Sequence, residues 1–582
     1  MSRFLENAHA KNTKRNLFFA SFFLALALTA DCRLTSRDPP RSSVVDDHHR
    51  EARSLIKSSC SSTLYPDLCL SQLTSSSSLT SNAVKTSKDV IALALNLTIT
   101  SVQHNYLAIK KVAAQRGLTV RETTALHDCL ELADETLDEV RETLTELLAY
   151  PNGGNKLVSE LVDDMKTLLS AAMTNQDTCL DGFSHDSADK KVGEALLGGQ
   201  LHVFHLCSNA LAMIKNMTDP DVANERQLSA NRRLKEVIKE EGEEEERDPI
   251  QWPKWLSAGD RRLLQSTTLT PDVTVAADGS GNYRTVSEAV AAAPERSERR
   301  YIIKIKAGVY KENVEVTSRK SNLMFVGDGM ATTIITGNRN VVDGSTTFNS
   351  ATVAVAGEGF LARDITFENT AGPSKHQAVA LRVNNDFAAF YRCAMLAYQD
   401  TLYVHSFRQF YYGCFVVGTI DFIFGNAAAV LQNCDIHARR PNPSQRNMVT
   451  AQGRDDPNQN TGIVIQKCRI SARPDLLEVK DSFESYLGRP WKEYSRTVIM
   501  QTEISDIIHP AGWYPWDGNF ALDTLFYAEH ANTGDGANTE NRVTWKGVRV
   551  ISASEAQAFT ADQFIDGASW LSSTGFPYYP GL

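Results

Sequence analysis

A four-residue pattern, Phe390-Tyr391-Arg392-Cys393, returns as Tyr411-Tyr412-Gly413-Cys414 and again as Leu431-Gln432-Asn433-Cys434, at intervals of 21 and 20 residues. Short runs rich in β-branched and aromatic residues surround it, separated by Gly, Asn and Asp at turn positions. A period of this length indicates stacked coils that contribute equivalent strands. The pattern therefore predicts a parallel β-helix in the second half of the chain. The expected strands include Tyr301–Ile305, Leu323–Val326, Ala351–Val355 and Val464–Ile470, and a helical end is expected around Ser554–Ile565.

The same period brings cysteines together. Successive coils of a parallel β-helix lie about 4.8 Å apart, which is within the Cα separation that a disulfide spans. We therefore expect bridges Cys393–Cys414 and Cys434–Cys468. The alternative is a stack of reduced cysteines inside the helix.

The first half of the chain has a different periodicity. Apolar residues recur every three or four positions in Ser87–Val102, Glu122–Leu148 and Leu157–Thr174, with hardly any Gly or Pro inside these runs. Residues 46–218 are thus predicted to form an all-α, antiparallel four-helix bundle. The cysteine spacing suggests that Cys60–Cys69 closes a short hairpin and that Cys129–Cys179 links two long helices.

Two further segments flank the bundle. Residues 1–45 contain Lys11, Lys14 and Arg15 ahead of the apolar run Leu17–Leu28, which predicts a signal peptide, or alternatively an uncleaved signal anchor. Either one delivers the chain to the secretory lumen, where disulfides form and where Asn96 and Asn216, both in Asn-x-Thr sequons, are candidate glycosylation sites. Residues 219–264 are predicted to be a charged linker, with the acidic run Glu240–Glu246.

Composition limits the possible partners. The 582 residues are 42% apolar and 22% charged, typical of a folded, water-soluble protein, and the net charge is −10. Residues 265–582 hold 29 Lys and Arg against 33 Asp and Glu, so most of the acidic excess lies upstream. We expect no nucleic acid partner and take a monomer as the default.

Five strings in the second half carry a specific resemblance. They are Gly308-Val309-Tyr310-Lys311-Glu312, Gln377-Ala378-Val379-Ala380-Leu381, Gln399-Asp400-Thr401-Leu402, Asp421-Phe422-Ile423-Phe424-Gly425 and Leu487-Gly488-Arg489-Pro490-Trp491. In this order, residues 265–582 resemble the pectin methylesterases, which implies a right-handed parallel β-helix that hydrolyses methyl esters of polygalacturonate. Residues 46–218 resemble the plant invertase and pectin methylesterase inhibitors, which implies two disulfides followed by an unpaired cysteine, here Cys207.

The coil period also orders the polar residues of these strings. Asp400 and Asp421 are 21 positions apart and Gln377 and Gln399 are 22 apart, so each pair should project from neighbouring coils. Two carboxylates held this close cannot both ionise easily, which provides an acid and a nucleophile. Ester hydrolysis requires these two groups and donors for the tetrahedral oxyanion.

We therefore expect Asp421 to be the nucleophile and Asp400 the general acid and then base. Gln377 and Gln399 are the expected oxyanion donors, and Arg489 is expected to hold Asp421 ionised. These are also the roles that the resemblance implies, and no metal or other cofactor is required. The resemblance further implies that Thr347 and Trp491 contact substrate, with Gln377 and Arg489.

The resemblance also implies how the protein is processed and where it is delivered. Arg261-Arg262-Leu263-Leu264 resembles the processing motif of the plant enzymes, so a subtilisin-like protease would start the mature chain at Gln265. The product would reach the plant cell wall through the endoplasmic reticulum and Golgi, bind pectin and encounter protein inhibitors. The helical half is expected to restrain activity before cleavage.

Three alternatives remain open on sequence grounds. A polysaccharide lyase or a galacturonan hydrolase would share the β-helix, because fold does not name a reaction. A binding protein is the alternative from a different class, in which the helical half is the functional part. A serine esterase and a zinc hydrolase are disfavoured, because the sequence has neither a Gly-x-Ser-x-Gly nor a His-Glu-x-x-His motif.

Overall fold

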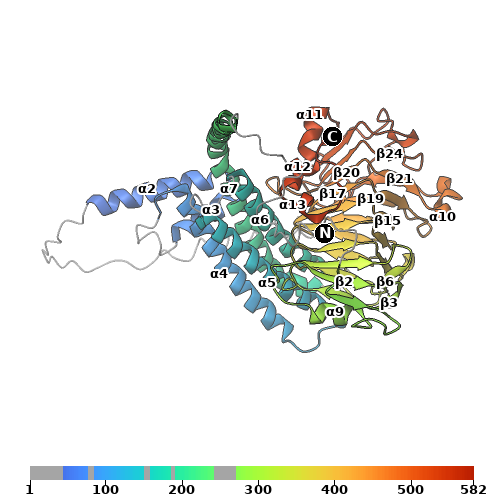
Figure 1. The fold of residues 1–582 in the computed structure, drawn as a ribbon. Helices are drawn as coiled ribbons and strands as arrows, with labels where there is room; N and C mark the ends of the chain where they lie inside the picture. The colour runs from blue at the N-terminus through green and yellow to red at the C-terminus, as the bar shows by residue number, and fades with distance from the viewer. Residues whose placement is uncertain (1–42, 76–83, 150–157, 185–189, 241–269) are drawn as a thin grey trace.

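The computed structural model describes residues 43–75, 84–149, 158–184, 190–240 and 270–582. Figure 1 shows two parts side by side, a group of long helices and a stack of short parallel strands. The two-part architecture that the sequence predicts is therefore confirmed. The α5 and α6 helices lie on the side of the helical part that faces the strands.

The helical part is built around four long helices. Its elements are α2 (Ser43–Cys60), α3 (Pro66–Ser75), α4 (Ser87–Ala113), α5 (Val120–Ala149), α6 (Val158–Asp181) and α7 (Lys190–Glu240). α4 and α6 each pack against both α5 and α7, which closes the bundle. α4 begins with a capping box, in which Thr86 and Asp89 exchange hydrogen bonds. Gly199 lets α7 approach α4 closely, because a Cβ there would lie 2.2 Å from Oδ1 of Asn105.

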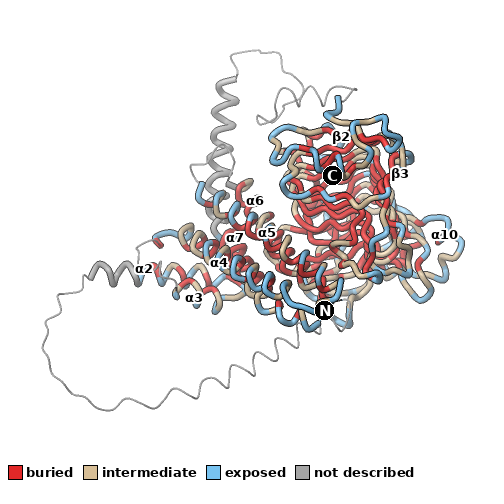
Figure 2. Tube along the Cα trace, turned by 90° about the horizontal axis from the view of Figure 1, so that it is seen from below, coloured by how far each residue is buried: buried red, intermediate tan, exposed pale blue. Residues whose placement is uncertain are grey.

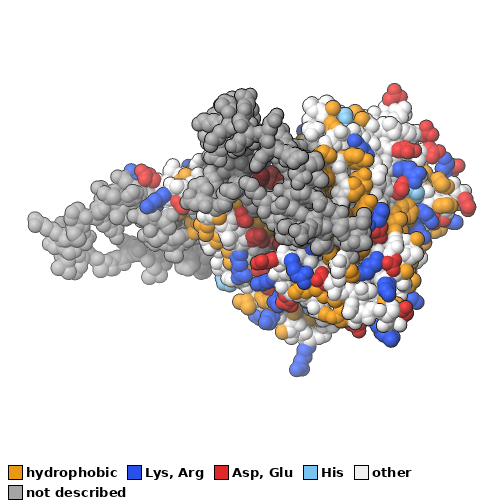
Figure 3. Space-filling view, in the orientation of Figure 1, with side chains coloured by type: hydrophobic (Ala, Val, Ile, Leu, Met, Phe, Trp, Pro, Cys, Tyr) orange, Lys and Arg blue, Asp and Glu red, His pale blue; other side chains and the backbone are white. Residues whose placement is uncertain are grey.

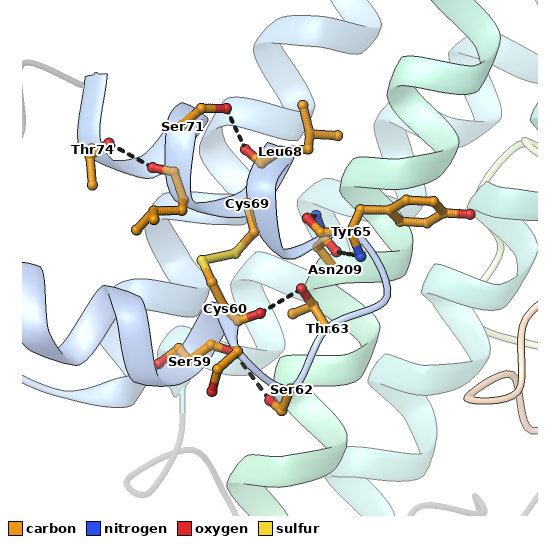
Figure 4. Close-up of a disulfide and its surroundings, with 12 residues drawn as sticks. Ser59, Cys60, Ser62, Thr63, Tyr65, Leu68, Cys69, Ser71, Thr74 and Asn209 are labelled. Atoms are coloured by element: carbon orange, nitrogen blue, oxygen red, sulfur yellow. Dashed lines mark hydrogen bonds between the residues drawn. A yellow bond between two sulfur atoms is a disulfide. The ribbon is translucent and has the colours of Figure 1, made fainter. Parts of the chain in front are cut away.

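Two disulfides tie these helices together. Cys60–Cys69 joins α2 to α3 with a Cα–Cα distance of 5.6 Å, and Cys129–Cys179 joins α5 to α6 at 4.6 Å. Figure 4 shows the first bridge, beside which Asn209 of α7 accepts a hydrogen bond from the backbone N–H of Tyr65 at 3.1 Å. The hairpin is thereby attached to the bundle. Cys207 is a buried thiol.

The second part is a β-helix of three parallel sheets. One sheet comprises β1 (Val273–Val275), β2 (Tyr301–Ile305), β5 (Leu323–Gly327), β8 (Leu361–Arg363), β11 (Ala388–Tyr391), β14 (Arg408–Tyr412), β17 (Ala428–Gln432), β20 (Gly462–Gln466), β23 (Arg496–Met500), β25 (Phe526–His530) and β26 (Val548–Val550). The second comprises β3 (Gly308–Lys311), β6 (Thr333–Gly337), β9 (Thr366–Asn369), β12 (Ala394–Leu396), β15 (Phe415–Gly418), β18 (Asp435–Ala438), β21 (Arg469–Ala472) and β24 (Glu503–Ile504). The third comprises β4 (Val314–Val316), β7 (Val353–Val355), β10 (Leu381–Val383), β13 (Leu402–Val404), β16 (Ile423–Gly425), β19 (Asn447–Gln452) and β22 (Ser485–Gly488).

Short helices complete this part. They are α9 (Val286–Ala292) before β2, α10 (Pro474–Leu477) after β21, and α11 (Ala553–Ala556), α12 (Ala561–Phe564) and α13 (Gly567–Thr574) at the end of the chain. The expected helical end around Ser554–Ile565 is thus present, and it packs outside the eleven-stranded sheet through Trp570. The expected strand Val464–Ile470 is instead two strands, β20 and β21, because Lys467 adopts φ 53° and turns the chain between two sheets.

The repeated four-residue pattern marks the same turn in each coil. Phe390 pairs in register with Tyr411, and Tyr411 with Leu431, so their side chains stack inside the β-helix. The Phe390 and Tyr411 rings are 4.9 Å apart and nearly parallel. The third residue of the pattern has a left-handed backbone in every copy, with φ 50° at Arg392, 59° at Gly413 and 53° at Asn433. Figure 2 shows the resulting buried interior in red.

The cysteines of this pattern do not form the two bridges predicted above. Cys393, Cys414, Cys434 and Cys468 are buried thiols. Each projects into the interior in the same direction, so the sulfur of one coil lies over the backbone of the neighbouring coil and not opposite its sulfur. The N–H of Cys414 donates to Sγ of Cys434 at 3.4 Å, and the N–H of Cys434 donates to Sγ of Cys468 at 3.3 Å. Coil spacing alone permits a disulfide, but the required convergence of the Cβ–Sγ bonds is missing.

Other sequence predictions can be placed in part. α7 continues to Glu240, so the expected linker at 219–264 begins as helix. Asn96 on α4 and Asn216 on α7 are both exposed. The signal segment up to residue 42 and the motif Arg261–Leu264 lie outside the described residues. Within the described ranges, no helix is both long and apolar enough to cross a membrane.

Charged side chains of both signs are interspersed over the visible face of the β-helix (Figure 3). This agrees with the nearly balanced charge counted for residues 265–582.

Candidate active site

The predicted carboxylates lie just before two middle strands of the seven-stranded sheet, β13 and β16. Leu381 of β10, Leu402 of β13 and Ile423 of β16 are paired in register. Asp400 and Asp421 each precede their strand by two residues, so they occupy equivalent positions on neighbouring coils. Both are buried and both have left-handed backbones, with φ 64° and 51°. Such strained positions are tolerated by Asp and are common where function requires a fixed side chain.

Arg489 contacts one of these two carboxylates. It follows β22 directly, and its Nε and Nη2 donate to Oδ1 and Oδ2 of Asp421 at 2.8 and 2.5 Å. This bidentate pair binds the carboxylate form of Asp421 and fixes its orientation. The guanidinium also lies over Trp516, with its Cζ 4.3 Å from the ring centroid.

Asp400 is in a different electrostatic environment. Burial is the largest cause that raises the pKa of Asp400 well above its ordinary value, and the charge of Asp421 raises it further against the opposing effect of Arg489. Asp400 therefore favours its protonated form more than an ordinary carboxyl does, and it lies one coil from an Asp421 that Arg489 holds.

The two predicted glutamines lie on neighbouring coils, although not at equivalent positions. Gln399 lies three residues before Leu402, whereas Gln377 lies four residues before Leu381. The N–H of Ala378 donates to the backbone oxygen of Gln399 at 3.2 Å. Both glutamines are partly exposed. Gln399 directly precedes Asp400 in the chain, and Gln377 lies one coil away.

Two aromatic residues that sequence reasoning did not single out, Tyr403 and Phe424, form an aromatic wall with Trp491 across the strands of this sheet. The Tyr403 and Phe424 rings stack at 4.2 Å, and the ring of Trp491 is 6.0 Å from Phe424. Tyr403 and Phe424 are the outward residues at the middle of β13 and β16, so a strand register was needed to identify them. Gly453 leaves room for Trp491, because a Cβ there would lie 2.8 Å from its Cε3.

Thr347 lies at the other end of this wall. It precedes the short 3-10 helix η2 (Phe348–Ser350), and Phe348 packs against Arg382, whose Cζ is 3.3 Å from the Phe348 ring centroid. The structure thus brings Asp400, Asp421, Arg489 and the two glutamines together. It places Trp491 on one side of them and Thr347 on the other.

Comparison with known proteins decides the family. The sequence profile of the pectinesterases matches residues 272–568, and that of the plant invertase/pectin methylesterase inhibitors matches residues 54–213. The chain belongs to the pectinesterase family. It is 62% identical over 570 residues to pectinesterase 3 of Citrus sinensis, covering 98% of this chain and 96% of the relative. It is 64% identical over 543 residues to pectinesterase/pectinesterase inhibitor 3 of Arabidopsis thaliana, covering 91% of each.

A solved structure agrees with this. The pectin methylesterase from carrot is 69% identical, with a TM-score of 0.54, and the match covers 55% of this chain and 100% of the carrot chain. The protein is therefore a pectinesterase, a carboxylic ester hydrolase that acts on pectin, preceded by a region like a pectin methylesterase inhibitor. The carrot chain thus matches a part of this chain about as long as the β-helix.

In the pectinesterase structure, the inhibitor-like helices cover the site. Side chains of α5 and α6 form one apolar cluster with the aromatic wall, and Trp491 and Trp516 pack at its margin. The cluster includes, from the helices, Ala125, Leu126, Cys129, Leu132, Ala133 and Cys179, and from the β-helix, Phe348, Ala354, Tyr403, Phe424 and Ala451. The Cys129–Cys179 bridge thus belongs to the same apolar cluster as the aromatic wall.

Hydrogen bonds surround this apolar contact. Thr178 of α6 bonds to Nε2 of the buried His405 at 2.9 Å, and the amide of Asn426 donates to Thr174 at 2.9 Å. Thr346 donates to the carboxylate of Asp128 on α5. Burial and the nearby Arg382 lower the pKa of His405 to about 3, so this imidazole is neutral.

Proposed function

We propose that residues 265–582 hydrolyse the methyl esters of polygalacturonate to pectate and methanol, with Asp421 as nucleophile and Asp400 as acid and base. The observation that carries this assignment is the buried pair of carboxylates in which only Asp421 is held by Arg489. The raised pKa of Asp400 supports its assignment as the group that carries the proton.

The reaction follows from these roles. An oxygen of Asp421 attacks the ester carbonyl, and the side-chain amides of Gln377 and Gln399 donate to the oxyanion that forms. Asp400 gives its proton to the departing methoxide, which leaves as methanol. The ionised Asp400 then takes a proton from water, whose oxygen attacks the anhydride with Asp421 and releases the galacturonate. Arg489 keeps Asp421 in its attacking orientation through both steps.

Substrate binding is assigned to the aromatic wall. The ring of Trp491 offers an apolar face to a sugar, and Thr347 is assigned a contact at the opposite end. Gln377 is assigned a contact with the ester group of the reacting sugar. Arg489 is assigned a place beside that sugar, where it holds Asp421. This arrangement leaves a polymer free to extend past the site in both directions.

The helical part is assigned an autoinhibitory role. The apolar cluster and the bonds from α5 and α6 occupy the surface on which a polymer would lie. Cleavage after Leu264 by a subtilisin-like protease would separate the two parts and release a secreted enzyme to the plant cell wall. The free β-helix would then present the same surface to separate inhibitor proteins.

Methanol release from highly methylated pectin tests the reaction. Residues 265–582 should release methanol without shortening the polymer, and Asp421→Ala should abolish the release although the variant folds. Chain shortening would indicate a hydrolase or lyase instead. A correctly folded wild type that does neither would favour the binding-protein alternative.

The uncut chain tests the role of the helices. A chain whose Arg261 and Arg262 are replaced by Ala should release methanol far more slowly than residues 265–582. A secreted chain that lacks residues 46–218 shows how much folded enzyme is obtained without the helical part. Equal activity of the uncut and mature forms would refute autoinhibition.

A further inference from the structure

A cavity of about 250 Å³ lies between the two parts, away from the reacting carboxylates. Its wall on the β-helix consists of turns that follow strands of the seven-stranded sheet, such as residues 384–387 after β10 and Phe407 after β13. Asp400 and Asp421 precede their strands, so the cavity lies past the opposite ends of these strands. Its other wall is formed by α5 and α6, the helices that face the β-helix in Figure 1.

The cavity is strongly acidic. Eight acidic side chains line it, five of them on α5, and Arg408 is the one cation among the described residues of its lining. Arg408 is already paired, with Asp386 of the β-helix at 2.5 Å and with Asp164 of α6 at 2.8 Å. The lining therefore carries a large excess of acidic groups.

Other carboxylates of the helical part meet cations of the β-helix. Nη2 of Arg382 is 3.5 Å from Oε1 of Glu131 on α5, and Nζ of Lys492 is 3.4 Å from Oδ1 of Asp177 on α6. The acidic groups of the cavity depart from this pattern, because the β-helix presents amides to them.

Two buried carboxyl groups of the lining bond to amides. Nδ2 of Asn384 donates to Oε1 of Glu135 at 3.1 Å, and Nδ2 of Asn175 donates to Oε2 of Glu139 at 3.0 Å. Burial and the charge of Glu131 raise the pKa of Glu135 to about 8, and burial and the charge of Glu135 raise the pKa of Glu139 well above its ordinary value. A bound cation would favour the ionised form of both. The other charged groups that act on the pair are Asp138 and Glu142 of α5 and Glu315 and Arg382 of the β-helix.

Two acceptors of the lining lack a donor. Asn384 is 3% exposed and Asn385 is 2% exposed, and both line the cavity. Oδ1 of each is buried and makes no hydrogen bond within the described part of the chain. Because buried oxygens are normally paired, these two indicate a ligand that brings N–H donors or positive charge.

The lining also distinguishes between kinds of cation. Among the described residues, no three acidic, histidine or cysteine side chains are placed to hold one metal ion. The acids of α5 are instead spread along the helix at intervals of three or four residues, roughly 5–6 Å along its axis. Leu168, Phe387 and Phe407 line the same cavity. Charges at intervals, with apolar surface beside them, fit a chain of ammonium groups separated by methylenes.

We propose that this cavity binds a linear aliphatic polyamine, whose ammonium groups pair with the acidic side chains of α5 and donate to Asn384 and Asn385. Such a ligand contacts both parts, so its binding holds the helices on the β-helix. The site itself does not depend on the reaction, whereas its effect on activity rests on the proposed autoinhibition. A polyamine should therefore strengthen the restraint that α5 and α6 exert.

Calorimetry with spermidine as the probe tests the site. The protein is the uncut chain, in which Arg261 and Arg262 are replaced by Ala. Spermidine should bind in a salt-sensitive way and release protons at pH 7, because its charge favours the ionised forms of Glu135 and Glu139. The heat of binding in two buffers with different ionisation enthalpies measures this release. Calcium chloride should bind at least about tenfold more weakly, because calcium requires about six to eight converging oxygen ligands.

Variants separate binding from damage to the fold. Glu135→Gln together with Glu139→Gln should weaken binding by about a hundredfold, about tenfold for each lost ion contact, and should abolish the proton release. Glutamine resembles the protonated carboxyl group, so the contact between the two parts should persist. Asn385→Asp adds a charge to the lining and should strengthen binding, which a damaged fold cannot imitate. Glu194→Gln, at an exposed position of α7, is the matched control and should bind as the wild type does.

Methanol release tests the effect on activity. At pH 8, spermidine should slow release by the uncut chain but not by its double glutamine variant, a comparison that removes any effect of the amine on pectin itself. Equal slowing of both chains would overturn the regulatory effect. Absence of spermidine binding, unchanged binding by the double variant, or tighter binding of calcium would overturn the site. Binding by a chain that releases no methanol in any form would support the site and refute only the proposed reaction.

Discussion

Replacing Arg489 with Met in residues 265–582 removes the only cation that contacts Asp421 in the described structure. Asp421 is 5% exposed and stays beside Asp400, so the change leaves a buried carboxylate without its partner. Breaking such a pair costs about 3–5 kcal/mol. Because the Arg489 side chain is 23% exposed, water replaces part of the lost interaction, and we expect the lower end, about 3 kcal/mol. At about 2 °C per kcal/mol for a chain of this size, the unfolding midpoint at neutral pH should fall by about 6 °C.

The loss of Arg489 should also affect Asp400. Arg489 opposes the rise of the pKa of Asp400, so its removal should raise that pKa further.

Thermal unfolding at pH 7.5, monitored by circular dichroism, measures the loss of stability, with methanol release as a parallel assay. The double variant Asp421→Asn with Arg489→Met is the control, because it removes both charges. It should recover most of the stability of the single variant at pH 7.5 and still release no methanol. A single variant whose midpoint equals that of the wild type, or a double variant no more stable than the single one, would refute the reasoning.

Three other predictions follow from the same structure. Gly453→Ala should displace the ring of Trp491 and lower kcat/KM for pectin by about tenfold or more. The displacement should also shift the tryptophan emission. Unchanged kinetics would show that the position of the ring does not matter for the reaction. The uncut chain should gain activity as the pH rises through 7 to 8. Burial raises the pKa of Asp128 and Asp181 to about 7 and, together with the charge of Glu131, that of Glu135 to about 8, so the contribution of these three groups to docking is present below about pH 4 and is lost through this range. Methanol release from the uncleavable variant measures the gain, and activity that falls over this range would contradict it. The five buried thiols of the described residues should not react with a thiol reagent in the native protein, and all five should react after unfolding without reductant. If only one of the five reacted after unfolding, the two predicted disulfides would be present after all.

Several features of the site could be predicted from the sequence because they repeat with the coil. The 21-residue spacing of Asp400 and Asp421 placed them at equivalent positions, since equal spacing along stacked coils gives equal position on the surface. The left-handed turn residues of the four-residue pattern likewise follow from a local requirement that each coil repeats. The string at Leu487–Trp491 indicated an arginine for Asp421, and the structure places Arg489 there.

The state of the cysteines required the tertiary structure. Period and spacing are the same for a column of disulfides and for a column of thiols, and only the direction of each Cβ–Sγ bond distinguishes them. Here every sulfur lies over the backbone of the neighbouring coil, so proximity does not produce a bond.

The contact between the two parts could not be predicted from the sequence either. Glu131 and Arg382 are 251 positions apart, and Asp177 and Lys492 are 315 apart, so no local pattern connects them. Taken alone, Arg382 is one charge in a short strand and Lys492 is one lysine after a tryptophan. The sequence by itself determined two parts, their folds and the carboxylates of the site, because each depends on local periodicity. Which groups the helices cover, and which cations their carboxylates neutralise, was decided only by how the two folded surfaces pack together.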